Sequence, residues 1–89
     1  MSIIYTSQFK KDYKRIQRQN KDIDELRTVI EKLHCQQPLE ARHRDHKLSG
    51  YRKEHRECHI KSDWLLIYRF DGHDLILERT GSHSDLFKS

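Results

Sequence analysis

The chain has 89 residues and a formal net charge of +4, with 34% hydrophobic and 36% charged residues. This length predicts a single domain over residues 1–89 with one modest, sparingly filled core. No apolar run approaches the ~20 residues of a membrane span, and the first residues lack the apolar stretch of a signal peptide. Two isolated cysteines form no disulfide framework, so we expect a cytoplasmic protein with an acidic partner and no membrane partner.

The first part of the chain predicts a short strand followed by two helices. Residues 3–5 are β-prone, and Thr6 or Ser7 can cap the helix that follows. Apolar residues recur at helical spacing, as Phe9, Tyr13 and Ile16 in the first helix and as Ile23, Leu26, Ile30 and Leu33 in the second. Residues 20–22 interrupt this pattern, and Pro38 is expected to stop the second helix, whose apolar stripe runs to about residue 34.

The remaining residues predict a small sheet. Residues 36–50 are polar, basic and expected to be irregular, and residues 51–60 resemble a polar edge strand. A predicted turn at 61–63 precedes a nearly apolar run from 64 to 70, which is typical of a central strand covered on both faces. Asp71 and Gly72 indicate a hairpin into a last strand at 75–80, after which residues 81–89 leave the sheet. We therefore expect an α+β fold, with two N-terminal helices on a small, largely antiparallel sheet in the order β-α-α-β-β-β.

Seven histidines occur in the chain, and six of them lie between His43 and His83 among arginines and lysines. An imidazole with an unperturbed pKa of ~6.5 accepts and donates protons near neutrality, and the surrounding cations attract a polyanion. These properties favour RNA cleavage by the RNA's own 2′-OH, which needs a general base, a general acid and a cation at the phosphorane.

That reaction needs no metal ion or other cofactor. Zinc at Cys58 and His59 is disfavoured, because adjacent strand residues point to opposite faces.

Three regions offer candidate groups to a shared groove. Alternation along the last strand predicts that Arg79 and His83 share one side with the apolar positions 75 and 77, about 13 Å apart if the strand stays extended. His59 and Asp63 flank the preceding turn, and His46 lies in the basic loop. A hairpin would bring His59 and Asp63 close together, so these regions predict one site.

Simpler explanations compete for several positions. The histidines expected on the surface are His34, His43, His55 and His73. Trp64 opens an apolar strand and, from its position alone, is expected in the core rather than as a base-stacking platform. Arg79 could form an ordinary ion pair with Glu57 or Glu78. From the residues alone, a nuclease or nucleic-acid binder is only modestly favoured over a protein-binding module.

Four segments together resemble the YafQ branch of the RelE/ParE toxin superfamily. Residues 45–50 read D-H-x-L-x-G, residues 59–68 read H-x-x-x-D-W-x-L-x-Y, and residues 78–87 read E-R-T-G-x-H-x-x-L-F. Residues 5–12, with the pattern Tyr-x-x-x-Phe-Lys-Lys-Asp, fit the same family. The order and spacing of these motifs are specific together, and they span essentially the whole chain.

The resemblance implies a RelE-like ribonuclease fold and the toxin of a bacterial type II toxin–antitoxin system, acting in the cytoplasm. Such a toxin is a ribosome-dependent mRNA endoribonuclease that cuts in the A site, inhibits translation and is neutralised by a cognate antitoxin. Operator DNA would be a partner only through the antitoxin complex. The family's catalytic positions fall on His46, His59, Asp63, His83 and the phosphate-stabilising Arg79. The expected substrate-binding residues are Trp64, Phe87, Lys47 and Arg44.

Individual roles stay open at this point. We expect His83 to be the general acid, because it stands alone at a strand end. Asp63 or His59 supplies the base, or Asp63 only orients His59, and His46 contacts phosphate or shares in proton transfer. The competing functions are a ParE-like toxin directed at DNA gyrase and an inactive relative that serves as an antitoxin-binding corepressor.

Overall fold

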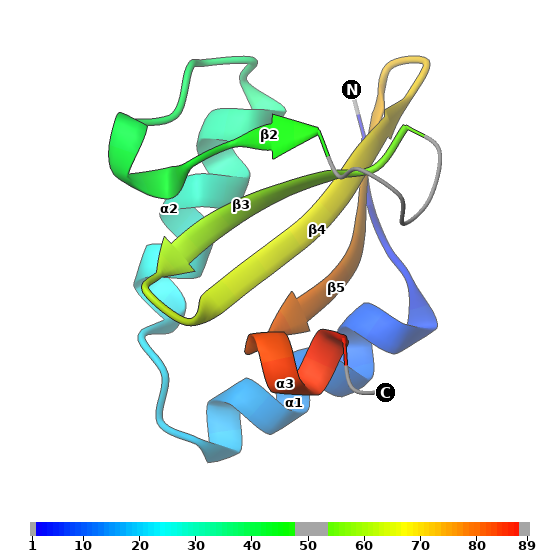
Figure 1. Cartoon of the computed structure of the whole chain (residues 1–89). Helices are drawn as coiled ribbons and strands as arrows, with labels where there is room; N and C mark the ends of the chain where they lie inside the picture. The colour runs from blue at the N-terminus through cyan, green and yellow to red at the C-terminus, as the bar shows by residue number, and fades with distance from the viewer. Residues whose placement is uncertain (1, 48–53, 88–89) are drawn as a thin grey trace.

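The structure, a computed structural model, describes residues 2–47 and 54–87. Its elements in chain order are β1 (Ile3–Tyr5), α1 (Ser7–Arg18), α2 (Ile23–His34), the 3₁₀ turn η1 (Ala41–His43), β2 (His46–Lys47), β3 (Arg56–Lys61), β4 (Trp64–Asp71), β5 (Asp74–Gly81) and α3 (His83–Leu86). The sheet has the order β1-β5-β4-β3-β2, in which β1 runs parallel to β5 and every other pair is antiparallel (Figure 1). The predicted α+β class and the largely antiparallel sheet are confirmed.

Local hydrogen bonds fix where the two long helices begin and end. The Thr6 side chain accepts from the backbone N–H of residue 9, and Asp22 caps α2 in the same way. Both helices end one residue before a C-cap followed by a residue with positive φ, Asn20 at 58° and Gln36 at 57°. The backbone bonds there are those of a Schellman motif. Helix α2 therefore ends at its own motif, and the prediction that Pro38 stops it is wrong.

The core lies between the sheet and the pair α1 and α2. It contains Phe9, Ile16, Leu26, Val29, Leu33, Cys58, Ile60, Trp64, Leu66, Tyr68, Leu75 and Leu77. On the opposite face of the sheet, Leu65 and Ile67 pack against Leu86 of α3. Figure 1 shows this arrangement, with α2 behind the sheet and α3 in front of it. The sheet therefore has one face covered by α1 and α2 and a second face on which the short α3 packs.

The sheet differs from the sequence prediction at three places. Strand β3 is internal, because β2 pairs outside it, so the predicted edge position is wrong. Residues 51–53 of the predicted strand lie outside the described residues. The loop before β3 contains η1 and β2, and the C-terminal segment contains α3, which begins at a capping box between Ser82 and Asp85. None of these three short elements carries enough periodicity to be predicted.

A bulge in β5 changes which side chains share a face. Leu77 pairs with Tyr68, whereas Arg79 pairs with Ile67, so Glu78 is an extra residue in β5. Residues directly opposite each other share a face, and Ile67 belongs to the face that α3 caps. Arg79 therefore lies on the α3 face, and the prediction that it shares a side with positions 75 and 77 is wrong.

Helix α1 covers the part of β5 that β1 leaves unpaired. The Thr6 hydroxyl donates to the carbonyl of Glu78 at 2.9 Å, and Asp12 accepts from the backbone N–H of Thr80 at 3.1 Å. Arg15 donates to the carbonyl of Thr80 at 3.1 Å. Side chains of α1 and of its N-cap thus satisfy backbone groups at the edge of β5 that β1 does not pair with. Over the described residues, no helix is long and apolar enough to cross a membrane.

Candidate active site

A row of aromatic rings crosses the sheet face that α3 caps. The ring centroids of His46 and His59 are 6.5 Å apart, those of His59 and His83 are 5.9 Å apart, and those of His83 and Phe87 are 6.0 Å apart. The rings come from β2, β3, the start of α3 and its C-cap. Three regions far apart in the sequence thus contribute histidines to one row, which we call the histidine row (His46, His59 and His83).

The carboxylate of Glu57 lies close to two imidazoles of the histidine row. Its Oε1 is 3.4 Å from Nε2 of His46 and 3.6 Å from Nε2 of His59. Glu57 is 6% exposed and the His59 side chain 13%, so that contact lies largely out of water, whereas the His46 side chain is about half exposed. Sequence reasoning considered Glu57 only as an ion-pair partner of Arg79. Its position two residues before His59 on the same strand, hence on the same face, was the available signal.

Backbone carbonyls hold the imidazoles of His46 and of His43, which lies outside the histidine row. Nδ1 of His46 is 2.6 Å from the carbonyl oxygen of Arg44, a residue with φ of 47°. Nδ1 of the buried His43 is 2.7 Å from the carbonyl oxygen of His59. Because a carbonyl oxygen only accepts, both Nδ1 atoms carry a proton. The other ring nitrogen of His46, Nε2, then faces Glu57. His43 and His55 are buried, so the prediction that they are surface residues is wrong for these two.

Asp63 contacts His83. Its Oδ1 is 3.1 Å from Nδ1 of His83 and accepts from the backbone N–H of the same residue at 3.3 Å. Hydrogen bonds from the side chain and then the backbone of His83 hold the pKa of the Asp63 carboxyl below its usual value. The Asp63 carboxylate therefore stays ionised at neutral and mildly acidic pH, and it is protonated only as the pH falls through that lowered pKa. A carboxylate that ionises so readily is a poor proton acceptor, but it orients the imidazole with Nε2 turned outward.

A third carboxylate, that of Asp45, ties the start of the short strand β2 to the sheet. Asp45 receives two hydrogen bonds from Arg56, at 3.4 and 3.3 Å, and a short one from the hydroxyl of Tyr68. Burial is the main cause that raises the pKa of Tyr68, so the hydroxyl keeps its proton and donates. Since Asp45 precedes His46 directly, this contact fixes the chain at the point where the histidine row begins.

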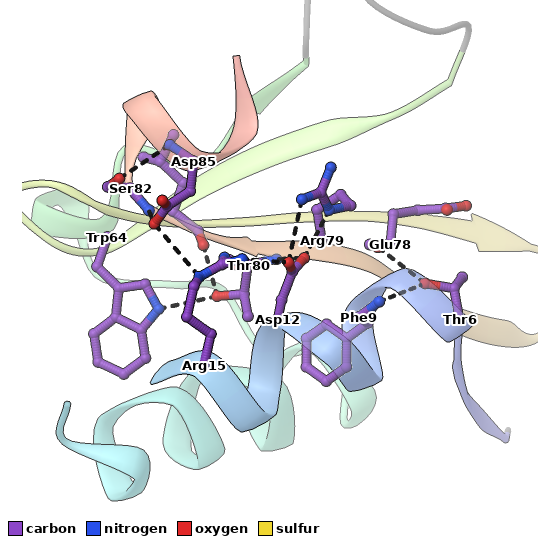
Figure 2. Close-up of polar contacts among 11 residues, drawn as sticks. Thr6, Phe9, Asp12, Arg15, Trp64, Glu78, Arg79, Thr80, Ser82 and Asp85 are labelled. Carbon is purple, nitrogen blue, oxygen red and sulfur yellow. Dashed lines mark hydrogen bonds and ion pairs between the residues drawn. The ribbon is translucent and has the colours of Figure 1, made fainter. Parts of the chain in front are cut away.

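Arg79 reaches the same face with its guanidinium held by α1. Its Nε is 2.7 Å from Oδ2 of Asp12 and its Nη2 is 3.1 Å from Oδ1, a two-point contact drawn in Figure 2. The side chain of Arg79 is 25% exposed. Sequence reasoning did not consider Asp12 as its partner, because the two residues lie 67 positions apart in the chain.

The four predicted substrate-binding residues occupy different environments. Trp64 is 2% exposed and its indole N–H donates to the Thr80 hydroxyl at 2.9 Å, which confirms the predicted core position. The expectation that Trp64 contacts substrate is corrected, because its ring has almost no exposed surface. Phe87 is 39% exposed beside His83 and can stack on a base. Arg44 and Lys47 are exposed at the β2 edge, where Lys47 pairs with Arg56 and so turns away from the histidine row.

Gly81, immediately before the N-cap of α3, has no room for a side chain. A Cβ there would lie 2.6 Å from Nη2 of Arg15 and 3.2 Å from Cβ of Asp85, and its φ is +154°. We expect Gly81→Ala to lower the free energy of unfolding by about 1–3 kcal/mol, because Arg15 and α3 must shift. Gly72→Ala, at φ of +61° in open space, should cost about 1 kcal/mol. Denaturant melts of the wild-type protein and both variants check this, and a Gly81→Ala midpoint equal to that of the wild type would contradict it.

The described residues contain no group of three or more His, Cys, Asp and Glu arranged to hold a metal ion. Cys58 lies in the core on the helix-covered face, whereas the adjacent His59 lies on the α3 face. Burial raises the pKa of the Cys58 thiol, which keeps it protonated. What the site does offer is imidazoles for proton transfer, a carboxylate behind two of them, and an oriented guanidinium for an anion.

Comparison with known proteins gives consistent matches over nearly the whole chain. Residues 1–88 match the family described as bacterial toxin of type II toxin–antitoxin system, YafQ. The chain is 40% identical over 86 residues to a protein named mRNA interferase toxin YafQ from Escherichia coli, covering 96% of this chain and 94% of that protein. It is 30% identical over 73 residues to a putative toxin YafQ from Haemophilus influenzae, covering 79% and 72%.

Solved structures agree with these sequence matches. The chain is similar, at 39% identity and a TM-score of 0.89, to a chain in the crystal structure of the E. coli DinJ–YafQ toxin–antitoxin complex, covering 97% of this chain and 96% of that one. It is also similar, at 39% identity and a TM-score of 0.93, to a metal-bound toxin from Helicobacter pylori, covering 98% and 99%. Fold and sequence thus point to the same family.

Proposed function

Because this chain belongs to the YafQ family of toxins from bacterial type II toxin–antitoxin systems, we propose that it is an mRNA interferase. In this proposal it cleaves mRNA in the A site of the ribosome and thereby inhibits translation. The observation that carries the proposal is the histidine row, in which the imidazoles of His59 and His83 have centroids 5.9 Å apart on the sheet face that α3 caps. This spacing lets a scissile phosphodiester contact an acid and a base together.

The reaction is transesterification by the 2′-OH of the RNA. His59 accepts the 2′-OH proton as the oxygen attacks phosphorus, and His83 protonates the 5′ oxygen as the P–O5′ bond breaks. The products are a 2′,3′-cyclic phosphate and a 5′-OH. Arg79 donates hydrogen bonds to the phosphorane, and His46 contacts the phosphate from the far side of His59. Each positioned acid or base contributes roughly 10²- to 10⁴-fold.

The geometry favours His59 over Asp63 as the base. Asp63 contacts His83 and has a lowered pKa, so it serves better to orient that imidazole than to accept a proton. His59 has Glu57 behind it, and this carboxylate stabilises the imidazolium that forms when His59 takes the proton. His46 shares Glu57 but lies further along the row, so we assign it to substrate contact.

The partners follow from the family and the charge. The E. coli YafQ in the solved complex is bound to the antitoxin DinJ, and we propose that a cognate antitoxin neutralises this chain in the bacterial cytoplasm. Operator DNA is then reached only through that complex. The net charge of +4 favours approach to ribosome-bound mRNA along the electrostatic field. His46 and His83 are about half exposed, and in this proposal the ribosome supplies the in-line arrangement of the 2′-OH that a flexible RNA lacks.

Primer extension on translating ribosomes tests this function. We expect the purified protein to give discrete cuts within the A-site codon, with no comparable cutting of the same RNA without ribosomes. Cutting should persist in excess EDTA once ribosomes are stabilised with a polyamine, because the proposed reaction uses no metal. An intact message on active ribosomes would overturn the proposal, and inhibition in a parallel gyrase supercoiling assay would then identify a different toxin class.

A further inference from the structure

Asp12 of α1 is a buried carboxylate at the centre of a polar network. The residue is 1% exposed. Its oxygens lie within hydrogen-bond distance of Nε and Nη2 of Arg79, at 2.7 and 3.1 Å, of the Thr80 backbone nitrogen at 3.1 Å, and of Nη1 of Arg15 at 3.1 Å. Figure 2 shows the carboxylate between α1 and β5, below the guanidinium that it holds. Removing a carboxylate from water costs free energy, so a buried carboxylate stays charged only when it is fully paired, as Asp12 is here.

We propose that Asp12 is a positioning residue for RNA cleavage, acting through Arg79 by fixing the direction of its guanidinium. The inference rests on the function proposed above, because it concerns the same reaction. It assigns catalytic importance to α1, a helix that carries none of the histidines and packs mainly against the helix-covered face of the sheet.

The charges of the network decide how Arg79 acts. The network has a net charge of zero, because it contains two guanidinium groups (Arg79 and Arg15) and two carboxylates (Asp12 and Asp85). Arg79 therefore brings little net positive charge to the face, and its contribution lies in N–H donors held at a fixed angle. An arginine side chain carries about 2 kcal/mol of rotamer entropy. The two-point contact with Asp12 removes this freedom before RNA binds.

The same network reaches the helix that carries His83. Arg15 donates to the carbonyl of Thr80 at 3.1 Å, and its Nε is 3.6 Å from Oδ2 of Asp85. Asp85 in turn forms the capping box with Ser82 at the start of α3. Helix α1 thus holds both the guanidinium and the base of α3 through adjoining contacts, which links two parts of the site that come from separate elements.

The variant Asp12→Asn separates orientation from charge. If Arg79 acts through its charge, removing the neighbouring negative charge should tighten RNA binding and leave turnover equal or faster. If Arg79 acts through orientation, the loosened guanidinium should lower kcat by about 10- to 100-fold with little change in KM. We expect the second result in single-turnover cleavage of ribosome-bound mRNA, and wild-type turnover in a folded Asp12→Asn variant would overturn the proposal.

The matched control is Asp24→Asn, which removes an exposed helical carboxylate 4.0 Å from Arg27 and should leave turnover unchanged. A double-mutant cycle with Arg79→Ala shows whether Asp12 acts through Arg79. The Asp12→Asn change should lose most of its effect on kcat in the Arg79→Ala background, and an undiminished effect there would indicate a merely structural role and contradict the proposal.

Folding is monitored by circular dichroism, with all rates measured well below the melting temperature. If Asp12→Asn does not fold, Asp12→Glu takes its place, because it keeps the charge but displaces the carboxylate by one methylene. If Arg79 acts through its orientation, that variant should turn over more slowly than the wild type. If Arg79 acts through its charge, the turnover of that variant should equal that of the wild type. A wild-type protein that does not cut ribosome-bound mRNA would instead refute the proposed function, so the two failures are distinguishable.

Discussion

His83→Ala should slow cleavage of ribosome-bound mRNA by about 10²- to 10⁴-fold relative to the wild-type protein. The physical reason is that the 5′ oxygen leaves as a poor alkoxide unless it is protonated, and His83 is oriented for this by the carboxylate of Asp63. The measurement is the single-turnover rate constant at saturating ribosomes. His73→Ala, which removes an exposed histidine at the turn between β4 and β5, is the control and should retain the wild-type rate.

A substrate with a sulfur at the 5′ leaving position identifies the role of His83. A thiolate leaves without protonation, so the His83→Ala variant should regain most of the wild-type rate on this RNA if His83 is the acid. A loss of equal size on the sulfur and oxygen substrates would contradict the acid assignment and would indicate that His83 positions the substrate instead.

His59→Ala should produce a loss of similar size, about 10²- to 10⁴-fold, because its ring centroid lies 5.9 Å from that of His83 and the two imidazoles can act on one phosphodiester. The reason is that His59 removes the 2′-OH proton with Glu57 stabilising the resulting imidazolium. Glu57→Gln should then lose up to about 10²-fold, since the imidazole loses the anion beside it but remains in place. The sulfur substrate should rescue neither variant, because deprotonation of the nucleophile precedes departure of the leaving group.

The comparison with His46→Ala decides the base assignment. His46 is about half exposed at an edge strand and shares the same carboxylate, so its loss should cost less than that of His59. A larger loss in His46→Ala than in His59→Ala would exchange the two roles. Melting curves for each variant show whether a rate loss has a structural cause.

The sequence predicted the parts of the fold that depend on periodicity and composition. The stripe from Ile23 to Leu33 and the apolar run from Trp64 identify α2 and β4, because burial requires those spacings. The three histidines of the row were predicted from chemistry and family motifs. Their meeting on one face depends on the pairing of β2 with β3 and on α3, which no local pattern specifies.

The errors about Arg79 and His43 share a physical cause, which is contact or pairing between distant segments. The extra residue Glu78 moves Arg79 to the opposite face, and a bulge has no strong sequence signal. The partner of Arg79 is Asp12, sixty-seven residues earlier, so neither residue alone predicts the pair. His43 is buried because its imidazole reaches a carbonyl of β3, which its basic surroundings in the sequence conceal.

The measurement that tests the central claim most directly is the chemistry of the RNA ends. The account predicts that the upstream fragment ends in a 2′,3′-cyclic phosphate and the downstream fragment begins with a 5′-OH. It also predicts that a single 2′-deoxy nucleotide at the cut position abolishes cleavage, because the attacking group is then missing. An upstream 3′-OH with a downstream 5′-phosphate, or undiminished cutting of the 2′-deoxy substrate, would show that water attacks instead and would contradict the roles assigned to His59 and His83.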